Sequence, residues 1–191
     1  MKLALLSMVA LTAAIIISCN TSTVKTTELV AISNDSLVKK GAYLVGIMGC
    51  DDCHSPKKMG AHGPEIIDSL RLSGYPANRP VAKIDMESIK NGWALLGADL
   101  TSAAGPWGLS FSANITNDES GIGTWNIENF KKAFTEGKWK GMEGTRMLLP
   151  PMPWANYKNL KEEDLKAIFA FLKSTNPVKN VVPDPKQLAQ L

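Results

Sequence analysis

The sequence predicts an all-α protein whose helices are separated by long loops. Three stretches, at about residues 34–47, 125–136 and 161–173, carry apolar residues at helical rather than strand spacing. Between them lie irregular segments with many glycines and prolines and no sustained period, the longest at 55–114. With 191 residues, 45% of them hydrophobic, the chain suits one globular domain with a real core.

The first helix is expected to begin near residues 34–36, an Asn-Asp-Ser run that can cap a helix N-terminus. Gly41 and Gly46 lower its helix propensity, so each is expected to permit a close contact. Gly49 then lets the chain turn. The apolar positions of this helix include Leu37, Leu44 and Ile47.

Two further helices follow, and a short one is expected within residues 85–96. Gly137 is a stop signal for the helix at 125–136. Three acidic residues at 162–164 favour the first turn of the helix at 161–173 through its dipole. The expected buried faces are Ile127, Phe130, Ala133 and Phe134 on one helix, and Leu165, Ile168, Phe169 and Leu172 on the other.

Residues 1–18 have the layout of a secretory signal peptide, with a positive start followed by an apolar run that is short for a permanent transmembrane helix. The Ile-Ile-Ser run before Cys19 is similar to the lipobox of bacterial lipoproteins, in which the signal is removed and the cysteine is lipidated. We expect 19–33 to be a lipidated tether, 34–182 the folded domain and 183–191 a C-terminal tail. The alternative is a soluble secreted protein in which Cys19 occurs by chance.

The run Cys50-Asp51-Asp52-Cys53-His54 has the spacing of an attachment site for c-type haem. Two thiols two residues apart can add across the vinyl groups at one porphyrin edge, and the next histidine can bind the iron. The alternatives are a redox dithiol, which needs a preceding strand, and half of a zinc site, which needs further ligands such as His62. The motif occurs once, which predicts one haem, and no cysteine is left for a disulfide.

Beyond this motif, three stretches resemble monohaem class I-type cytochromes c, and more narrowly the bacterial c-type cytochromes associated with dehydrogenases. They are residues 41–44 leading into the haem motif, 113–116 with 121–125 and Phe130, and 149–154 followed by 164–172. The resemblance implies a cytochrome c-like fold with long loops wrapped around one covalently bound haem. It also implies that His54 is the proximal iron ligand and Met152 the distal one. Asn117, where a proline is expected, and Lys161, in place of a serine or threonine cap, depart from the pattern.

The residues themselves also favour Met152. A thioether suits low-valent iron and raises its reduction potential relative to a second imidazole, and prolines on both sides stiffen the loop. Met152 as a simple core filler, Met147 and His62 remain open alternatives for the distal position. The carbonyl of Pro64 is a candidate acceptor for the other nitrogen of His54.

We therefore expect an electron carrier, not an enzyme, that transfers single electrons between an exported or membrane dehydrogenase and a downstream oxidase or cytochrome. It could be a free shuttle or a fixed subunit of a dehydrogenase complex, lipid-anchored to a bacterial membrane and facing the periplasm. The alternative is a sensor or peroxidase-like haem protein with an open or labile distal site. A formal charge of +3 without a strongly basic tract gives no argument for nucleic acid. Lysines that could steer an acidic partner, or simply be solvated, are Lys57, Lys58, Lys138 and Lys140.

Overall fold

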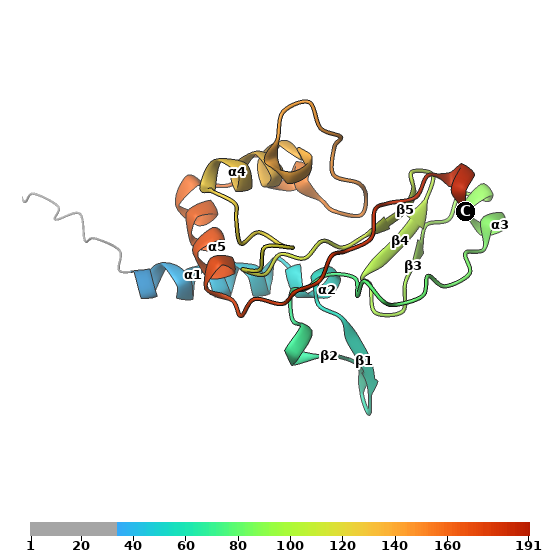
Figure 1. Cartoon of the computed structure of the whole chain (residues 1–191), viewed down its shortest axis with the longest axis horizontal. Helices are drawn as coiled ribbons and strands as arrows, with labels where there is room; N and C mark the ends of the chain where they lie inside the picture. Colours follow the sequence, from blue (N-terminus) through green and yellow to red (C-terminus); the bar gives the residue numbers. More distant parts are fainter. Residues whose placement is uncertain (1–33) are drawn as a thin grey trace, which may run out of the picture. The chain divides into compact units, whose positions relative to one another are not determined.

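The computed structural model describes residues 34–191. Its main core lies among three helices, α1 (Asn34–Ile47), α4 (Ile127–Glu136) and α5 (Glu162–Ser174) (Figure 1). The very short α2 (Cys50–His54) follows α1 directly. The predicted signal peptide, the tether and Cys19 lie outside the described residues.

Helix α1 packs closely along α5 at Gly41. A Cβ atom at this position would overlap the carbonyl oxygen of Ala167 and come within 2.7 Å of the Cβ of Phe171. The close contact expected at Gly41 is therefore confirmed. The one expected at Gly46 is wrong, because no heavy atom lies within 4 Å of a Cβ built there.

The predicted faces of α4 and α5 form the core. Of the eight side chains expected to be buried, six are buried and Ile127 and Phe169 are partly buried. Helix α4 begins after Asn126, whose side chain accepts a hydrogen bond from the Asn129 amide at 2.8 Å, and ends at Gly137 with φ 70°. The buried residues of this core cluster are Val45, Leu72, Ile122, Phe130, Phe134, Leu165, Ile168 and Leu172.

The expectation of an all-α fold is wrong, because residues 55–114 contain two small antiparallel sheets (Figure 1). The first is a hairpin of β1 (Lys57–Gly60) and β2 (Gly63–Ile66), and the second joins β3 (Leu95–Leu96), β4 (Ser102–Gly105) and β5 (Gly108–Phe111). Strands of two to four residues are too short to show an alternating pattern, so no strand signal is visible in the sequence. The short helix expected within residues 85–96 is confirmed, as α3 (Met86–Lys90).

The three-stranded sheet has a small core of its own and holds the C-terminal segment. Ile89, Ala104 and Leu109 are buried there, and Leu188 packs against them. Lys186 pairs with Leu109 through two backbone hydrogen bonds of 2.8 and 3.0 Å. The four single-turn 3-10 helices of the described chain are η1 (Asp68–Leu70), η2 (Trp139–Gly141), η3 (Trp154–Tyr157) and η4 (Leu188–Gln190).

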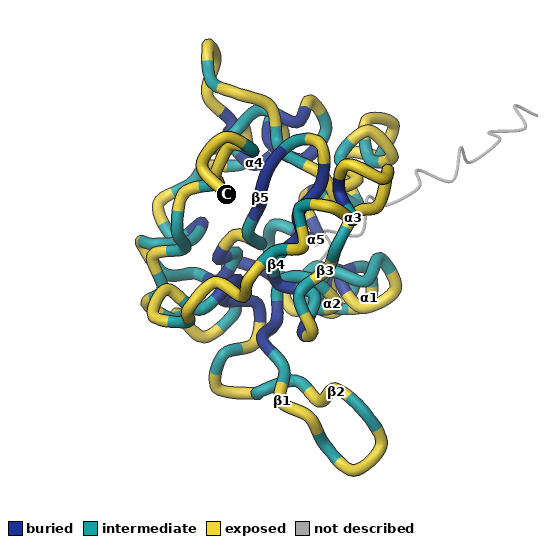
Figure 2. The backbone as a smooth tube through the Cα atoms, turned by 90° about the vertical axis from the view of Figure 1, so that its right-hand side faces the viewer, coloured by how far each residue is buried: buried dark blue, intermediate teal, exposed yellow. Residues whose placement is uncertain are grey.

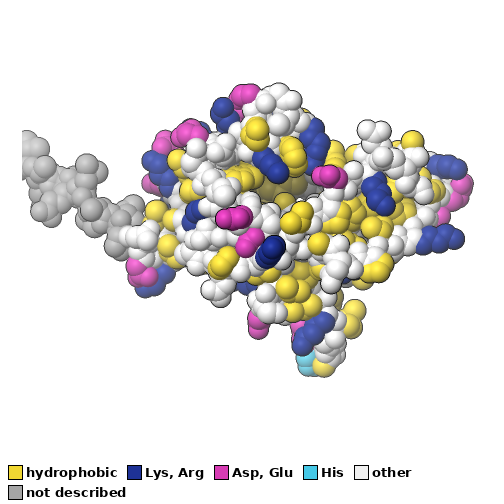
Figure 3. Space-filling model, in the orientation of Figure 1, with side chains coloured by type: hydrophobic (Ala, Val, Ile, Leu, Met, Phe, Trp, Pro, Cys, Tyr) yellow, Lys and Arg dark blue, Asp and Glu magenta, His cyan; other side chains and the backbone are white. Residues whose placement is uncertain are grey.

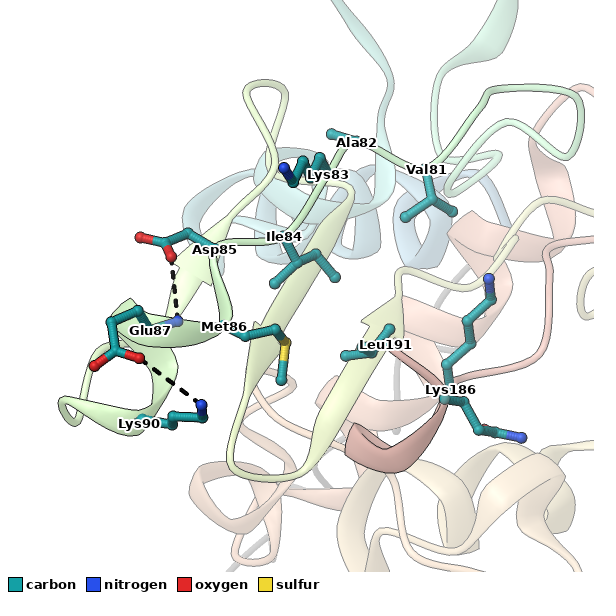
Figure 4. A pocket seen from close by; sticks show the side chains of 11 residues that line it. Val81, Ala82, Lys83, Ile84, Asp85, Met86, Glu87, Lys90, Lys186 and Leu191 are labelled. Atoms are coloured by element: carbon teal, nitrogen blue, oxygen red, sulfur yellow. Dashed lines mark hydrogen bonds and ion pairs between the residues drawn. The ribbon is translucent and has the colours of Figure 1, made fainter.

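A cavity of about 790 Å³ lies beside this sheet (Figure 4). It is lined mainly by α3, the residues before it and the C-terminal segment, including Val81, Met86, Lys186 and Leu191. None of the five haem-motif residues lines it.

In Figure 2 the β1–β2 hairpin is mostly exposed, while much of β5 is buried. Within residues 34–191, no helix combines the length and the apolar character needed to cross a membrane.

Candidate functional site

The five-residue helix α2 brings together the three motif residues that the sequence assigns to cofactor binding. Gly49, in the left-handed conformation with φ 69°, turns the chain into Cys50. Both Cys50 and Cys53 are free thiols and partly buried. Burial, together with the smaller effect of the Asp51 charge, raises the pKa of the Cys50 thiol to about 11. Burial also raises the pKa of Cys53, so both thiols are protonated at neutral pH.

The imidazole of His54 is held by a backbone carbonyl. Its Nδ1 lies 2.7 Å from the carbonyl oxygen of Ala113. Because a carbonyl can only accept, Nδ1 must carry the hydrogen, which leaves the lone pair of Nε2 for a metal. Burial lowers the pKa of His54, although the hydrogen bond to Ala113 acts in the opposite sense. The ring is therefore neutral, as a metal ligand must be.

The carbonyl of Pro64, the candidate acceptor for His54, is not its partner in the structure. Pro64 lies in β2, where it pairs with Met59 of β1. Ala113 takes its place although it is 59 residues away from His54 in the sequence. No side-chain chemistry at Ala113 could have pointed to this contact, because only the path of the chain brings its carbonyl to the ring.

Asp51, inside the motif, anchors α2 to the segment that follows β2. Its carboxylate accepts hydrogen bonds from Nε and Nη2 of Arg71 at 3.0 and 2.7 Å, and from the Ser55 hydroxyl at 2.6 Å. The Ser55 oxygen in turn accepts from the Leu72 amide at 2.9 Å. Burial alone would raise the pKa of Asp51, but the hydrogen bonds from Arg71 and Ser55 outweigh it and hold this pKa below its usual value.

Met152 is partly buried and packs against the same apolar cluster as Cys50. The loop that carries Met152 is tied to β5, because the Ser110 hydroxyl donates to the Pro150 carbonyl at 2.6 Å. Met147 is 41% exposed and belongs to an isolated bridge with Lys138. His62 is exposed in the turn between β1 and β2. Met152 thus lies on the core that Cys50 contacts, whereas Met147 and His62 do not.

The surroundings of α2 and Met152 are apolar and aromatic. Tyr157 stacks on Phe134 with ring centroids 4.6 Å apart, and burial raises its pKa. Tyr157 also packs against the core cluster that Cys50 contacts. In Figure 3 a recess with many hydrophobic side chains opens on the face of the molecule that also carries the loop between η2 and η3.

These residues fit a covalently attached haem. Two free thiols, a neutral imidazole with Nε2 available, a thioether and apolar walls are the groups that such a cofactor needs. The other interpretations of the motif fit less well. The helix α1, not a strand, precedes Cys50, and no cluster of three or more His, Cys, Asp or Glu in residues 34–191 could hold a metal ion.

Comparison with known proteins adds to this geometry. The family model described as "Cytochrome c" matches residues 38–176. Over 80% of the chain, the sequence is 29% identical to the gluconate 2-dehydrogenase cytochrome c subunit of Pantoea cypripedii, covering 26% of that protein. It is 26% identical, again over 80% of the chain, to the cytochrome c subunit of the quinone alcohol dehydrogenase of Gluconobacter oxydans, covering 25% of it.

A further match is to the fructose dehydrogenase cytochrome subunit of Gluconobacter japonicus, with 36% identity over 42% of this chain and 16% of that protein. The chain therefore spans about a quarter or less of the length of these relatives. The cytochrome c match itself contains the five motif residues and most of the core helices.

Proposed function

This chain belongs to the cytochrome c family, and from that premise we propose a one-electron carrier whose haem is attached to Cys50 and Cys53 and bound by His54 and Met152. When bound, the haem iron supplies the ferrous–ferric couple through which single electrons pass. Cys50 and Cys53 would attach the group and His54 and Met152 would bind its iron. Apolar side chains of the core cluster would shield it. The single copy of the motif supports one haem.

The observation that carries the proposal is the hydrogen bond of 2.7 Å from His54 Nδ1 to the Ala113 carbonyl. A carbonyl acceptor at Nδ1 fixes the tautomer and the ring orientation, and it increases the electron density at Nε2. This is the state in which a proximal histidine binds iron. The histidine of an unrelated surface turn would have no need of such an acceptor.

Met152 is the distal ligand in this proposal because of its packing and its tethered loop. Its side chain lies on the cluster that also contacts Cys50. The bond from Ser110 to the Pro150 carbonyl holds the loop two residues before it. If His54 and Met152 both bind the iron, they would leave it no coordination position for a substrate, as expected of an electron carrier and not of a sensor or peroxidase-like protein.

The proposed donor is a dehydrogenase and the proposed acceptor an oxidase or another cytochrome. Support comes from the relatives, which are named as cytochrome subunits of gluconate, alcohol and fructose dehydrogenases. We place the protein outside the cytoplasm, anchored to a bacterial membrane by lipid on Cys19. This part rests on the sequence of residues 1–19 alone.

The test is the optical spectrum of the oxidised holoprotein. A ferric haem bound by methionine sulfur has a weak charge-transfer band in the red, which should be present in the wild type. Met152→Ala should abolish this band and Met147→Ala, the matched control, should retain it. A high-spin wild-type spectrum would instead favour the open distal site, and loss of the band only in Met147→Ala would assign the ligand to Met147.

A further inference from the structure

The ammonium group of Lys57 lies at the C-terminal end of α2, among backbone carbonyls. Its Nζ is 3.2 Å from the carbonyl oxygen of Asp51, 2.7 Å from that of Asp52 and 2.9 Å from that of Ser55. A fourth carbonyl oxygen, that of Asp99, is 3.2 Å away. An ammonium has three N–H donors, so all of them are engaged and the charge is held in one place.

Helix α2 needs such a group because it is so short. A helix of five residues leaves its last carbonyls without partners inside the helix. The Gly74 amide donates to the His54 carbonyl at 2.7 Å, and Lys57 supplies donors to Asp52 and Ser55. A cation is also favoured at this end of a helix by the helix dipole.

The fourth acceptor is the main-chain carbonyl of Asp99, which lies between β3 and β4. Its carboxylate is buried and accepts hydrogen bonds from Arg79 at 2.5 Å and from the Thr101 hydroxyl at 2.7 Å. Lys57 therefore connects the haem-binding helix to the three-stranded sheet. In β5 of this sheet, Ser110 holds the loop of Met152. The sheet that the sequence did not predict joins the two segments that carry the proposed iron ligands.

We propose that Lys57 is a positioning residue that fixes the end of α2 at His54 and raises the reduction potential of the haem. The inference rests on the proposed function, because it needs a haem held by His54. Oxidation adds one positive charge to the iron, and a fixed cation nearby makes this addition less favourable. Because Lys57 is partly buried among carbonyls, salt should screen it less than an exposed lysine.

The neighbouring Lys58 provides a matched control, because it carries the same charge but its side chain is exposed. In haem-loaded full-length protein, Lys57→Met should lower the midpoint potential by more than Lys58→Met does. In high potassium chloride the effect of Lys58→Met should disappear while that of Lys57→Met persists. Equal potentials for the two variants at both salt concentrations would overturn the inference.

If Lys57→Met does not accumulate as folded protein, Lys57→Gln and Lys57→Arg provide the same test. Glutamine keeps N–H donors without the charge and should lower the potential, whereas arginine keeps both and should stay close to the wild type. Equal potentials for Gln and Arg would again refute the role of Lys57. A wild type without covalent haem would refute the proposed function itself, so the two failures are distinguishable.

Discussion

The hydroxyl group of Ser110 donates a hydrogen bond of 2.6 Å to the carbonyl oxygen of Pro150. Ser110 is buried in β5, where its oxygen also lies 3.2 Å from the Ala103 carbonyl and accepts a hydrogen bond from Trp107 Nε1 at 3.2 Å. The bond thus joins a fixed point of the sheet to the loop that carries Met152.

Ser110→Ala should therefore loosen this loop without changing the ligands. Loss of one such hydrogen bond costs about 1 kcal/mol, so the methionine–iron band should disappear at a lower temperature or urea concentration than in the wild type. The measurement is the red absorbance of the oxidised protein during unfolding. Ser69→Ala, at an exposed position of η1, should behave as the wild type. If the band disappears at the same temperature and urea concentration in Ser110→Ala as in the wild type, the bond does not restrain the loop.

Gly41→Val should destabilise the fold, because a side chain there would collide with the Ala167 carbonyl. Overpacking of this kind costs about 1–3 kcal/mol, which urea unfolding monitored by circular dichroism would measure. Gly46→Ala is the control in the same helix, where a Cβ meets no atom within 4 Å. It should stabilise the protein by up to about 1 kcal/mol, because alanine has the higher helix propensity. Similar effects of the two changes would contradict the close packing of α1 on α5.

Arg71→Met should make stability less dependent on pH. The pKa of Asp51 is lower in the folded protein than its usual value of about 3.9, so the ion pair with Arg71 contributes stability above that pH. This contribution is lost as the pH falls through the folded pKa. Since Arg71 is 44% exposed, we expect a loss of about 1 kcal/mol at pH 7 and a smaller one near pH 3.

The measurement is urea unfolding of the wild type and Arg71→Met at both pH values. Lys39→Met removes an ion pair with Asp35 in which both side chains are about three-quarters exposed, so it should change stability by less than about 0.5 kcal/mol. An effect of Arg71→Met that is no larger at pH 7 than near pH 3 would show that the pair is not what lowers the pKa of Asp51.

Replacing both Cys50 and Cys53 by serine should abolish covalent haem, because no thioether can then form. The measurement is haem-dependent peroxidase staining after denaturing electrophoresis. Cys19→Ser should keep the stain but release the protein from the membrane fraction, because it removes only the proposed site of lipidation. Covalent haem in the double variant, or membrane association that Cys19→Ser leaves unchanged, would contradict the corresponding assignment.

The sequence predicted the long helices because their buried faces repeat over ten or more residues, as Phe130 and Phe134 do in α4. The family resemblance to dehydrogenase-associated c-type cytochromes is also confirmed. The five strands of the described chain were missed because each has at most four residues, too few to show an alternating pattern of apolar and polar side chains. Backbone hydrogen bonds to the neighbouring strand define them instead, and these do not depend on the side chains.

Within the candidate site, residues with distinctive chemistry could be identified from the sequence and their supports could not. Cys50, Cys53 and His54 stand next to one another in the chain. Lys57 looked like one of several surface charges, yet its Nζ is engaged by four backbone carbonyls. These contacts depend on where the chain folds back, and so does the acceptor for His54.

That acceptor has a consequence for variation in the sequence. Position 113 contributes its main-chain oxygen, and the alanine side chain is exposed. Many residues could stand there and offer the same oxygen to the imidazole, so natural or engineered substitutions at 113 should be largely silent for the histidine. Insertions or deletions between His54 and position 113 are a different matter. Those that shift the oxygen away from Nδ1 would remove the hydrogen-bond partner of the ring while every motif residue stayed in place.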